Sequence, residues 1–412
     1  MGIALLALSA SSLAATVLVL VALARQSARL DADHALRGLP RPVDLEAFPL
    51  VSIVVPVRDE ERNVVPLLHA LLALDYPRFE VLVVDDASRD RTLELLRHTA
   101  ADDPRVRCLA LDEAGQGERS AFRSGKAFVL AQAAPQARGE WLLFADADTR
   151  LHPDALWRGV AFCRARGLDA FSSAGVYRNP RFWGDLLEGT LFAPLFLTVP
   201  LARVNDPARR DVGWANGQFL LVRRAVYERL GGHGAVRAFW VEDLALGRLF
   251  KLRGVPCCYC PDGRLFECVN YVGWREAHQG WARLVGSAAP WLGKRQGWFL
   301  RVAALLLLAG VLPLPLCALG WTTPAGLAAA GPLSARGLAL AAAALALFLQ
   351  GAVRWSAGLP LWRTALLPLG ALLTLGTLAA GWRVRWGAEF TWRGRALTVD
   401  DPALIRASYP SA

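Results

Sequence analysis

The feature that most constrains the fold is a run of about 22 uncharged residues at the start of the chain. Residues 3–24, with the sequence IALLALSASSLAATVLVLVALA, are long enough to cross the ~30 Å hydrocarbon core of a bilayer as one helix. A cleavable signal peptide is the alternative, but the length and the missing basic residues before the run favour a retained helix. Arg25, Arg29, Arg37 and Arg41 follow, so the positive-inside rule predicts that the chain beyond them lies in the cytoplasm.

The C-terminal third is apolar again, in residues 298–320, 337–353 and 361–381. The first and last of these have the length of spanning helices, whereas the middle one is Ala-rich and barely long enough. We therefore predict a transmembrane region over 298–382 and an arginine-rich tail over 383–412. Three crossings would place that basic tail outside the cytoplasm, which conflicts with its charge, so we expect one segment to be re-entrant or interfacial.

Composition fits a membrane protein with a basic surface. Hydrophobic residues make up 54% of the 412 residues, and the net charge is +10, carried almost entirely by arginine. Many arginines flank the apolar segments, which favours anionic lipids as partners, and no basic-aromatic nucleic-acid motif appears. Of the seven cysteines, Cys257, Cys258, Cys260 and Cys268 cluster. Zinc or a disulfide is possible there, but the pattern CCYC is more typical of a half-buried strand in a reduced cytosolic protein.

The residues between these apolar ends predict a soluble α/β domain over 48–290. The runs LVSIVVPV and FEVLVVDDAS are β-branched, and each is followed by polar residues and a helical pattern, which indicates βαβ units and a parallel sheet. GEWLLFADAD is a further strand. The apolar segment 181–203 carries Asp185 and Glu188 and is expected to be an amphipathic interfacial element, with a core helix of the domain as the alternative.

Two carboxylates, Asp146 and Asp148, lie at the end of the predicted strand GEWLLFADAD. At i and i+2 of an extended strand they point to the same face, and parallel sheets bind ligands at the carboxyl ends of their strands. Two such carboxylates repel each other unless a cation compensates, and a hard divalent ion that also binds phosphate oxygens fits best. The alternative is a solvated turn before a helix.

Other strands end in the same way. Asp85 and Asp86 end the run VVDDAS, and Glu60 and Glu61 lie just beyond the strand that ends near Pro56. If the three strands are neighbours, their acidic ends define one polar crevice.

Two helix beginnings also carry candidate residues. Gly125 and Lys126 open a helix in SGKAFVLAQA, where a lysine suits phosphate, although an exposed surface lysine is the alternative. The chain otherwise almost always uses arginine, which favours a functional lysine. Glu242 and Asp243 open the helix of FWVEDLALGRLFKLRG; they are either a general base or an acidic first turn that complements the helix dipole.

In order, these motifs resemble glycosyltransferase family 2, which has the GT-A fold. The resemblance covers roughly residues 50–290 and rests on VSIVVPVRDEERNV, VLVVDDASRDRT, SGKAFVLAQA, FADADT, NGQFLLVRRAVYERLGGH and VEDLALGRLF. YERLGGHGAVRAFWVEDLALGRLFKLRGV, EAHQGWARLVGSA and the terminal WRGRAL are similar to membrane-bound bacterial lipid glycosyltransferases, including those that glycosylate a C30 carotenoid acid. Ceramide glucosyltransferase is a more distant likeness.

The resemblance implies a nucleotide-sugar donor site. On the family pattern, Pro56, Val57 and Glu60 line the nucleoside pocket, Asp85 reads the uracil and ribose region, and Lys126 lies near the phosphates. The acid at 85 favours a uracil over a guanine nucleotide.

The resemblance also implies metal-dependent catalysis with Mg²⁺ or Mn²⁺. Asp148 matches the main metal ligand, and Asp146 contacts the ribose or the metal. Asp243, preceded by Glu242, matches the catalytic base, and Gly217 lies in the acceptor-side turn NGQF.

One departure concerns the acceptor side. Processive polysaccharide synthases of this family carry Gln-x-x-Arg-Trp, whereas this chain has Gln279, Trp281 and Arg283 in a changed order and spacing. Trp281 could stack on a sugar or lipid and Arg283 could hold the diphosphate, or both could be an interfacial anchor. The change favours a single transfer over a processive one.

We therefore expect an inverting glycosyltransferase of the bacterial inner membrane, with several crossings and a cytoplasmic catalytic domain. It would move one sugar from a nucleotide-diphosphate sugar, with UDP favoured, to a lipid such as a carotenoid acid, another isoprenoid or a sphingolipid. A processive polysaccharide synthase of the same family is one alternative. A non-catalytic membrane scaffold that keeps the fold is another.

Overall fold

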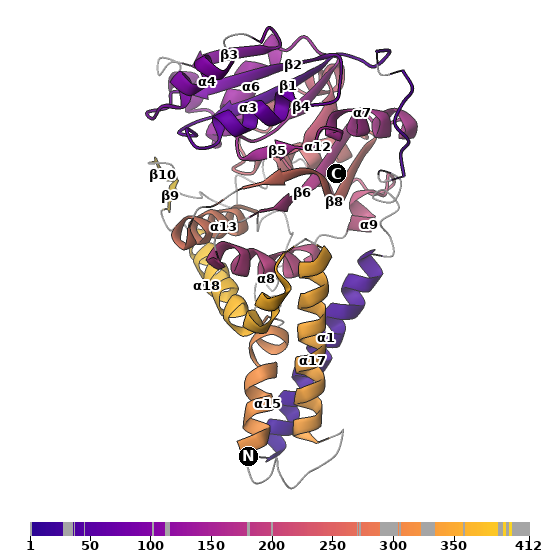
Figure 1. Ribbon diagram of the computed structural model, residues 1–412, viewed down its shortest axis with the longest axis vertical. Coiled ribbons are helices and arrows are strands. Elements are labelled where there is room, and N and C mark those ends of the chain that lie inside the picture. The colour runs from indigo at the N-terminus through magenta and orange to yellow at the C-terminus, as the bar shows by residue number, and fades with distance from the viewer. Residues whose placement is uncertain are drawn as a thin grey trace. The chain divides into compact units, whose positions relative to one another are not determined.

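A computed structural model describes most of the chain and divides it into two compact units. The described residues are 2–27, 36, 38–44, 46–100, 103–111, 116–178, 182–198, 201–269, 271, 273–288, 304, 306–322, 334–356, 359–385, 390–392 and 395–397. One unit holds an eight-stranded sheet with its helices, and the other gathers apolar helices from both ends of the chain and from its middle. The two units are described separately (Figure 1).

The sheet of the first unit has the strand order β3-β2-β1-β4-β7-β6-β8-β5. Its strands are β1 Val51–Val57, β2 Phe79–Asp86, β3 Val106–Leu111, β4 Trp141–Phe144, β5 Thr149–Leu151, β6 Ala170–Tyr177, β7 Leu220–Arg223 and β8 Cys257–Cys268. The first four strands in this order are parallel, and β7 runs antiparallel to both β4 and β6. The predicted α/β fold is confirmed, with a mixed sheet.

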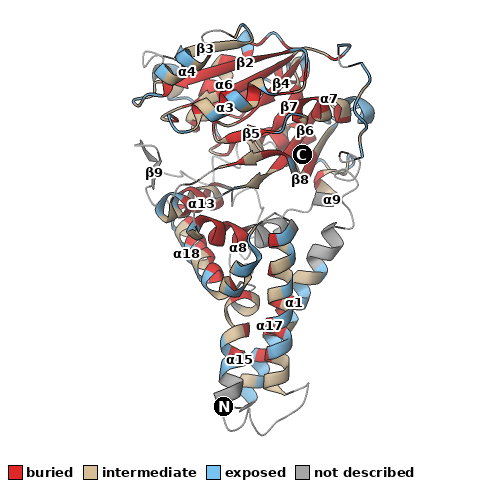
Figure 2. Ribbon diagram, in the orientation of Figure 1, coloured by how far each residue is buried: buried red, intermediate tan, exposed pale blue. Residues whose placement is uncertain are grey.

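Helices cover this sheet because their apolar residues recur at helical spacing. They are α3 Val64–Leu72, α4 Thr92–Ala100, α5 Gln116–Arg119, α6 Gly125–Ala133, η2 Ala134–Gln136, α7 Ala155–Arg166, α9 Leu201–Val204, α10 Arg224–Arg229, α11 Gly232–Ala235 and α12 Glu242–Leu252. In α3, Val64, Leu67, Leu68 and Leu71 form one buried stripe. Every residue of β2 is buried, as expected for a central parallel strand (Figure 2).

The cysteine pattern CCYC lies in β8, as predicted for a half-buried strand. Cys260 and Cys268 are fully buried, and Cys257 and Cys258 are partly exposed. The six cysteines for which the structure describes the side chain are all free thiols. Within the same described residues, no group of three or more histidine, cysteine or acidic side chains could hold a metal ion. The zinc and disulfide alternatives therefore find no support in this part of the chain.

The second unit consists mainly of helices. These are α1 Gly2–Ser27, α8 Phe182–Thr198, α13 Trp274–Ala288, the π-helical turn η4 Leu306–Val311, α15 Pro313–Thr322, α17 Ala335–Ser356, η5 Leu361–Leu366 and α18 Leu367–Arg385. A two-stranded hairpin, β9 Phe390–Trp392 and β10 Arg395–Leu397, also belongs to it. In this unit α1 and α15 pack on α17, and α18 packs on α8 and α13.

Three helices in the described residues are long and apolar enough to cross a membrane: Ile3–Val21, Ala335–Trp355 and Leu361–Val384. The first and last match spans expected from the sequence. The middle segment, expected to be barely long enough, is extended at both ends into a full helix. For the segment 298–320, residues 298–303 and 305 lie outside the described residues, and the remainder is divided between η4 and α15, which starts at Pro313.

The segment 181–203 differs from both sequence-based interpretations. Its helix α8 belongs to the helical unit, so it is not a core helix of the α/β domain. Its two acids, Asp185 and Glu188, are buried against other helices of that unit, whereas an amphipathic interfacial helix would expose them. Much of the predicted tail 383–412 lies outside the described residues.

We predict that acid destabilises the α/β unit through His233. This side chain is buried, its Nδ1 lies 2.7 Å from the Tyr227 hydroxyl, and burial, aided by the charge of Lys126, lowers the pKa of His233 to about 3. The unfolded chain binds a proton near the ordinary value of 6.5, so stability is lost as the pH falls from about 6.5 towards 3, by on the order of 5 kcal/mol in total. Urea unfolding of the solubilised protein across this pH range measures it.

The matched variants are His233→Gln and His98→Gln, since His98 is an exposed histidine. The first should flatten the pH dependence and the second should leave it unchanged. An equally steep dependence in His233→Gln would contradict the assignment.

Candidate active site

Three strands with acidic ends lie side by side in the sheet. β1 pairs with β2 on one edge and β4 on the other, both in parallel, so their carboxyl ends open at the same edge. In this register Val57 lies opposite Asp85. The predicted neighbourhood of the three strand ends is therefore confirmed.

The loops that follow β1 and β2 are tied together in a strained conformation. Asp59 and Ala87 both have a φ of 52°, a left-handed conformation that costs a residue other than glycine roughly 1–2 kcal/mol. Hydrogen bonds between the loops hold it: the Asp59 amide donates to the Ser88 hydroxyl (3.0 Å) and the Arg89 amide donates to the Asp59 carboxylate (2.8 Å). Such strain is concentrated at functional sites.

The two acids that end β2 have different surroundings. Asp86 accepts hydrogen bonds from Arg58 at 3.3 Å and from Arg119 at 2.6 Å, so its charge is compensated. Asp85 accepts one bond from the Ser88 amide at 3.1 Å through Oδ2. Its other oxygen, Oδ1, is buried and has no hydrogen-bond partner among the described residues. Asp85 thus keeps an acceptor atom for a ligand.

The residues predicted at the end of β1 are held in place by the sheet. Pro56 has no amide hydrogen, and it lies beyond Val54, the last residue of β1 that pairs with β4. Val57 is buried. Glu60 is buried beyond the strand, where its amide donates to the Thr92 hydroxyl at 2.7 Å and its carboxylate accepts from the Asn63 amide group at 2.7 Å.

The predicted lysine lies among three of the predicted acids. Lys126 Nζ is 2.5 Å from Asp146 Oδ1 and 3.5 Å from Glu242 Oε1. The Gly217 amide donates to Asp243 Oδ2 at 2.8 Å, and a Cβ atom at Gly217 would lie 2.7 Å from Lys126 Nζ. Residues from four distant parts of the chain therefore converge, and position 217 requires glycine because a side chain would displace the ammonium group.

Ser124 positions this cluster. It is the N-cap of α6, accepts a hydrogen bond from the Ala127 amide at 3.3 Å, and donates one to Glu242 Oε2 at 3.1 Å. Glu242 and Asp243 begin α12, as predicted.

The cluster alters the acidity of its members. Burial alone would lower the pKa of Lys126, but the carboxylates of Asp146, Glu242 and Asp243 outweigh it and raise the pKa. Burial and the neighbouring charge of Glu242 raise the pKa of Asp243 to about 6, against the opposing effects of Lys126 and of the Gly217 and Leu244 amides. A carboxylate with a pKa in this range can accept a proton near neutral pH.

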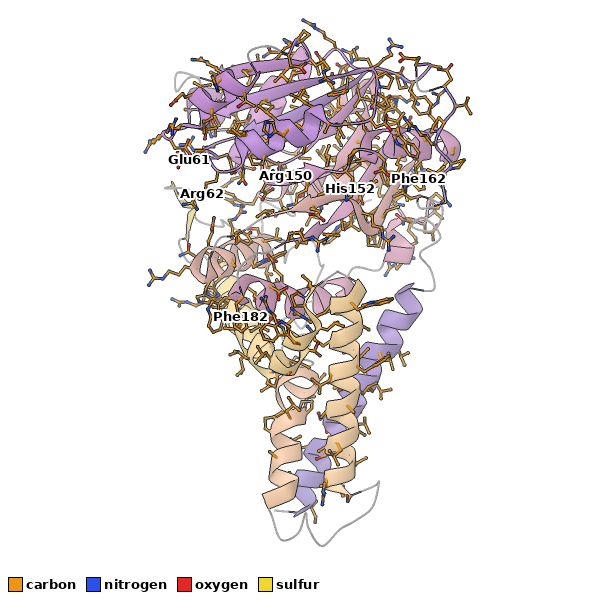
Figure 3. The ribbon with its side chains drawn as sticks, in the orientation of Figure 1. Glu61, Arg62, Arg150, His152, Phe162 and Phe182 are labelled. Atoms are coloured by element: carbon orange, nitrogen blue, oxygen red, sulfur yellow. The ribbon has the colours of Figure 1, made fainter. Side chains whose placement is uncertain are left out.

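Asp146 and Asp148 lie in a turn and not on the strand. β4 ends at Phe144, and the Thr149 amide donates to the Asp146 carbonyl oxygen at 3.1 Å. The argument from alternating strand side chains therefore does not apply. A residue the sequence did not suggest, Arg150 on β5, interacts electrostatically with Asp148 and is labelled in Figure 3.

Arg150 anchors this turn. Its guanidinium group donates to the Ala147 carbonyl oxygen at 2.9 Å and to Asn63 Oδ1 at 3.0 Å, which links the turn to the helix after β1. Arg119, which binds Asp86, was not predicted either. Neither arginine follows a recognisable spacing from its acid, so the sequence offers no signal for these contacts.

The acids fit a divalent metal ion of a particular kind. Asp146 and Asp148 offer only carboxylate oxygens, and no third ligand side chain completes a metal site among the described residues. This donor set suits a hard cation such as Mg²⁺ or Mn²⁺, which takes its other ligands from substrate phosphates and water.

Three of the four residues predicted at the acceptor side, all but Gly217, lie on α13 in the helical unit. Gln279 is exposed and Arg283 is half-buried. Trp281 is only 3% exposed, and its indole nitrogen donates to Glu188 of α8 at 3.3 Å. A buried indole has no free face for a sugar or for the lipid interface, so neither role expected for Trp281 fits this structure.

Comparison with known families adds to this geometry. Residues 52–231 match the family model "Glycosyl transferase family 2". Residues 52–231 are similar to this family, and we call this matched region the family 2 domain. The match covers β1 to β7 and includes Lys126, Asp146, Asp148 and Gly217. The family 2 match and the mixed sheet confirm the GT-A class that the sequence suggested.

Curated relatives of this region include two bacterial glycosyltransferases. The putative teichuronic acid biosynthesis glycosyltransferase TuaG of Bacillus subtilis is 29% identical over 150 residues, which is 36% of this chain and 55% of the relative. The 4,4'-diaponeurosporenoate glycosyltransferase of Staphylococcus aureus is 25% identical over 247 residues, 58% of this chain and 61% of the relative. The chain thus spans less than two thirds of these two relatives.

Solved structures with a similar fold include a mannosyltransferase, PcManGT, from Pyrobaculum calidifontis in complex with GDP-Man and Mn²⁺. It is 22% identical with a TM-score of 0.48, and the alignment covers 92% of this chain and 99% of that chain. Glucosyl-3-phosphoglycerate synthase from Mycobacterium tuberculosis is 18% identical with a TM-score of 0.41, over 60% of this chain and 80% of that chain.

We predict that Lys126→Met destabilises the family 2 domain by about 3 kcal/mol at neutral pH, because it leaves buried carboxylates without a cation. The loss should shrink as the pH falls below about 6, where Asp243 takes up a proton. Urea unfolding at several pH values measures both effects. Arg91→Met, which removes an exposed ion pair with Glu94, is the control and should not change the stability. Equal stability of Lys126→Met and wild type would contradict the cluster.

Proposed function

We propose that the protein is an inverting, metal-dependent glycosyltransferase that moves one sugar from a nucleotide-diphosphate sugar to a lipid. The observation that carries this proposal is the position of Lys126 beside Asp146, Glu242 and Asp243, at the carboxyl edge of the sheet in a family 2 domain. A cation among acids at this edge suits a pyrophosphate donor, because strand ends and helix beginnings there bind phosphates.

The nucleoside of the donor would bind beyond β1 and β2. Pro56, Val57 and Glu60 line that edge from one side and Asp85 from the other. The available Oδ1 of Asp85 would accept a hydrogen bond from the uracil N–H or from a ribose hydroxyl, which favours a UDP-sugar.

The diphosphate would bind between Lys126 and the turn after β4. When bound by Asp148 and Asp146, Mg²⁺ or Mn²⁺ would offset the negative charge of the leaving nucleoside diphosphate. Lys126 donates hydrogen bonds to the phosphate oxygens once they compete for it with Asp146. Arg150 keeps the turn, and with it Asp148, in place.

Asp243 would act as the general base. It takes the proton of the acceptor hydroxyl while that oxygen attacks the anomeric carbon from the face opposite the diphosphate, which inverts the configuration. The amides of Gly217 and Leu244 fix its two oxygens, and Glu242 helps to raise its pKa. Gly217 would thus act on the acceptor side.

The apolar helices support a lipid acceptor and a membrane location. We propose the layout expected from the sequence: a transmembrane helix over 1–25, a cytosolic catalytic domain over 48–290, a transmembrane region over 298–382 and a basic tail over 383–412, in the inner membrane. Relatives named for diaponeurosporenoate and for undecaprenyl phosphate fit an isoprenoid acceptor. Gln279 and Arg283 remain proposed acceptor-side residues.

We predict transfer of label from a radiolabelled UDP-sugar to extractable lipid by the full-length protein in membranes, and loss of transfer after chelation. Asp148→Asn should lower the rate by at least roughly 100-fold, because it weakens the binding of the metal ion that would offset the negative charge of the leaving nucleoside diphosphate. Asp211→Asn, a change at an exposed acid on the same unit, should leave the rate unchanged.

Three outcomes would contradict the proposal. If sugar transfer continues after a chelator is added, the reaction does not need a metal ion. A product that contains many sugars would favour the processive polysaccharide synthase. No transfer from any nucleotide sugar would favour the scaffold alternative.

We predict that Asp243→Asn lowers the rate by at least roughly 100-fold with a hydroxyl acceptor and only mildly with a carboxylate acceptor, which is already ionised. With a hydroxyl acceptor, the wild-type rate should fall as the pH drops below about 6, because Asp243 is then protonated and cannot accept a proton. Donor binding, measured by calorimetry, should persist in the variant. Loss of donor binding would show that Asp243 is not a base but part of the donor site.

A further inference from the structure

An ion cluster is buried in the helical unit, apart from the residues proposed for catalysis. Arg354 of α17 and Arg363 of η5 both donate to the same oxygen, Oδ2, of Asp185 on α8, the latter at 2.7 Å. Asp185 is 2% exposed and Arg354 is fully buried, whereas the Arg363 side chain remains 16% exposed. The exposed part of Arg363 makes the cluster reachable from outside.

Among the described residues, the charges of this cluster do not balance. Two guanidinium groups face one carboxylate, which leaves one positive charge in a low-dielectric setting. Glu188, the other acid of α8, accepts its hydrogen bond from Trp281. Nη1 of Arg354 and Nε of Arg363 are buried donors, and Oδ1 of Asp185 is a buried acceptor, that have no hydrogen-bond partner among the described residues. An uncompensated buried cation and unmet donors are costly, so the cluster lacks an anion.

The position along the helices fits the level of lipid headgroups. Arg354 is next to the end of the apolar helix Ala335–Trp355, and Arg363 is near the beginning of the next one, Leu361–Val384. Because few residues connect them, these two ends belong to the same side of a bilayer. Arginines at the ends of spanning helices typically lie at the headgroup level.

Aromatic side chains lie against Arg363, the partly exposed arginine of the cluster. The Arg363 guanidinium lies 5.2 Å from the ring centres of both Phe182 and Trp362. Phe182, labelled in Figure 3, opens α8. Trp183, Trp355 and Trp362 are exposed large apolar residues, and Trp355 is 75% exposed. A cation within an exposed aromatic rim suits a ligand that has both an anionic head and an apolar body, which a free ion lacks.

Gly189 allows this arrangement. A Cβ atom at Gly189 of α8 would lie 2.5 Å from Nη1 of Arg354, so any side chain there would push the guanidinium group away. The neighbouring Gln350 of α17 donates to the Gly189 carbonyl oxygen at 2.8 Å and holds the two helices together at this point.

We propose that Arg354 and Arg363 form a binding site for the phosphate group of an anionic lipid. The phosphate accepts hydrogen bonds from the donors that the cluster leaves unmet, and its charge balances the second arginine. The lipid tail lies against the exposed tryptophans. The phosphate can belong to a phospholipid headgroup or to a polyisoprenyl phosphate, and the proposal does not depend on glycosyl transfer.

The test uses the full-length protein in nanodiscs of phosphatidylcholine mixed with phosphatidylglycerol, and counts retained lipids by native mass spectrometry. Wild type should retain phosphatidylglycerol with roughly tenfold preference, and Arg363→Gln should lose that preference, while Asp185 keeps its pair with Arg354. Arg363→Lys keeps the charge and should keep part of the preference. The melting temperature of each variant shows whether it is folded.

A second pair of variants separates the site from general basicity. Gly189→Ala displaces Arg354 without a change of charge and should weaken retention. Gly351→Ala on α17 is its control, since a Cβ atom there makes only ordinary contact, and should retain lipid like wild type.

Two further arms identify the source of the phosphate. Polyisoprenyl phosphate in phosphatidylcholine nanodiscs should compete with phosphatidylglycerol if the site recognises the phosphate group alone. If polyisoprenyl phosphate does not compete, the ligand of the site is the phospholipid headgroup. The proposal is overturned if wild type retains both phospholipids equally, if Arg363→Gln and Gly189→Ala retain phosphatidylglycerol like wild type, or if inorganic phosphate alone displaces the lipid.

Discussion

The ion pair between Lys126 and Asp146 is the contact on which the rest of the site depends. Without a cation, Asp146, Glu242 and Asp243 would place like charges close together in a partly buried position, which is costly in a low-dielectric environment. Lys126 reaches them because Ser124 caps α6 and because Gly217 has no side chain. The same ammonium group therefore compensates the charge of these acids, and in the proposed function it would also bind the phosphates of the donor.

The loops around this cluster are built for fixed geometry. Two residues other than glycine adopt left-handed conformations after β1 and β2, and hydrogen bonds between the loops compensate the strain. Arg58 and Arg119 hold Asp86, while Asp85 keeps one oxygen available. Asp86 is thus compensated by arginines while the adjacent Asp85 has an oxygen without a hydrogen-bond partner among the described residues. This difference explains how the acidic strand ends can be stable and, in the proposed function, still bind a ligand.

Much of the α/β unit could be predicted from sequence because its signals are local. β1 and β2 are continuous β-branched runs, and the rule that parallel strands bind ligands at their carboxyl ends predicts that Asp85 and Asp146 lie at one edge. Lys126 was predicted instead from its place at the beginning of a helix. The sequence predicted that β4 continues to Asp148, because Ala145 and Ala147 extend the apolar pattern, but the strand ends at Phe144. Arg150 could not be foreseen, because its place depends on the pairing of β5 with β8, more than 100 residues away.

The helical unit was harder to predict for the same reason. Hydropathy identifies spanning helices, but it treats Asp185 and Glu188 as polar surface residues. Their burial depends on partners that come from α17, η5 and α13, far along the chain. Trp281 is also buried by a partner that is distant in the sequence, Glu188 of α8. The sequence motif suggested an exposed aromatic residue at this position, whereas Trp281 packs between helices.

The most direct test of the account is a cryo-electron microscopy structure of the full-length protein with UDP and Mn²⁺. The account predicts that the diphosphate lies at the carboxyl edge of β1, β2 and β4, with Asp148 as a ligand of Mn²⁺ and Lys126 Nζ in contact with a phosphate oxygen. A nucleotide bound elsewhere, with Lys126 still paired only to the acids around it, would contradict it.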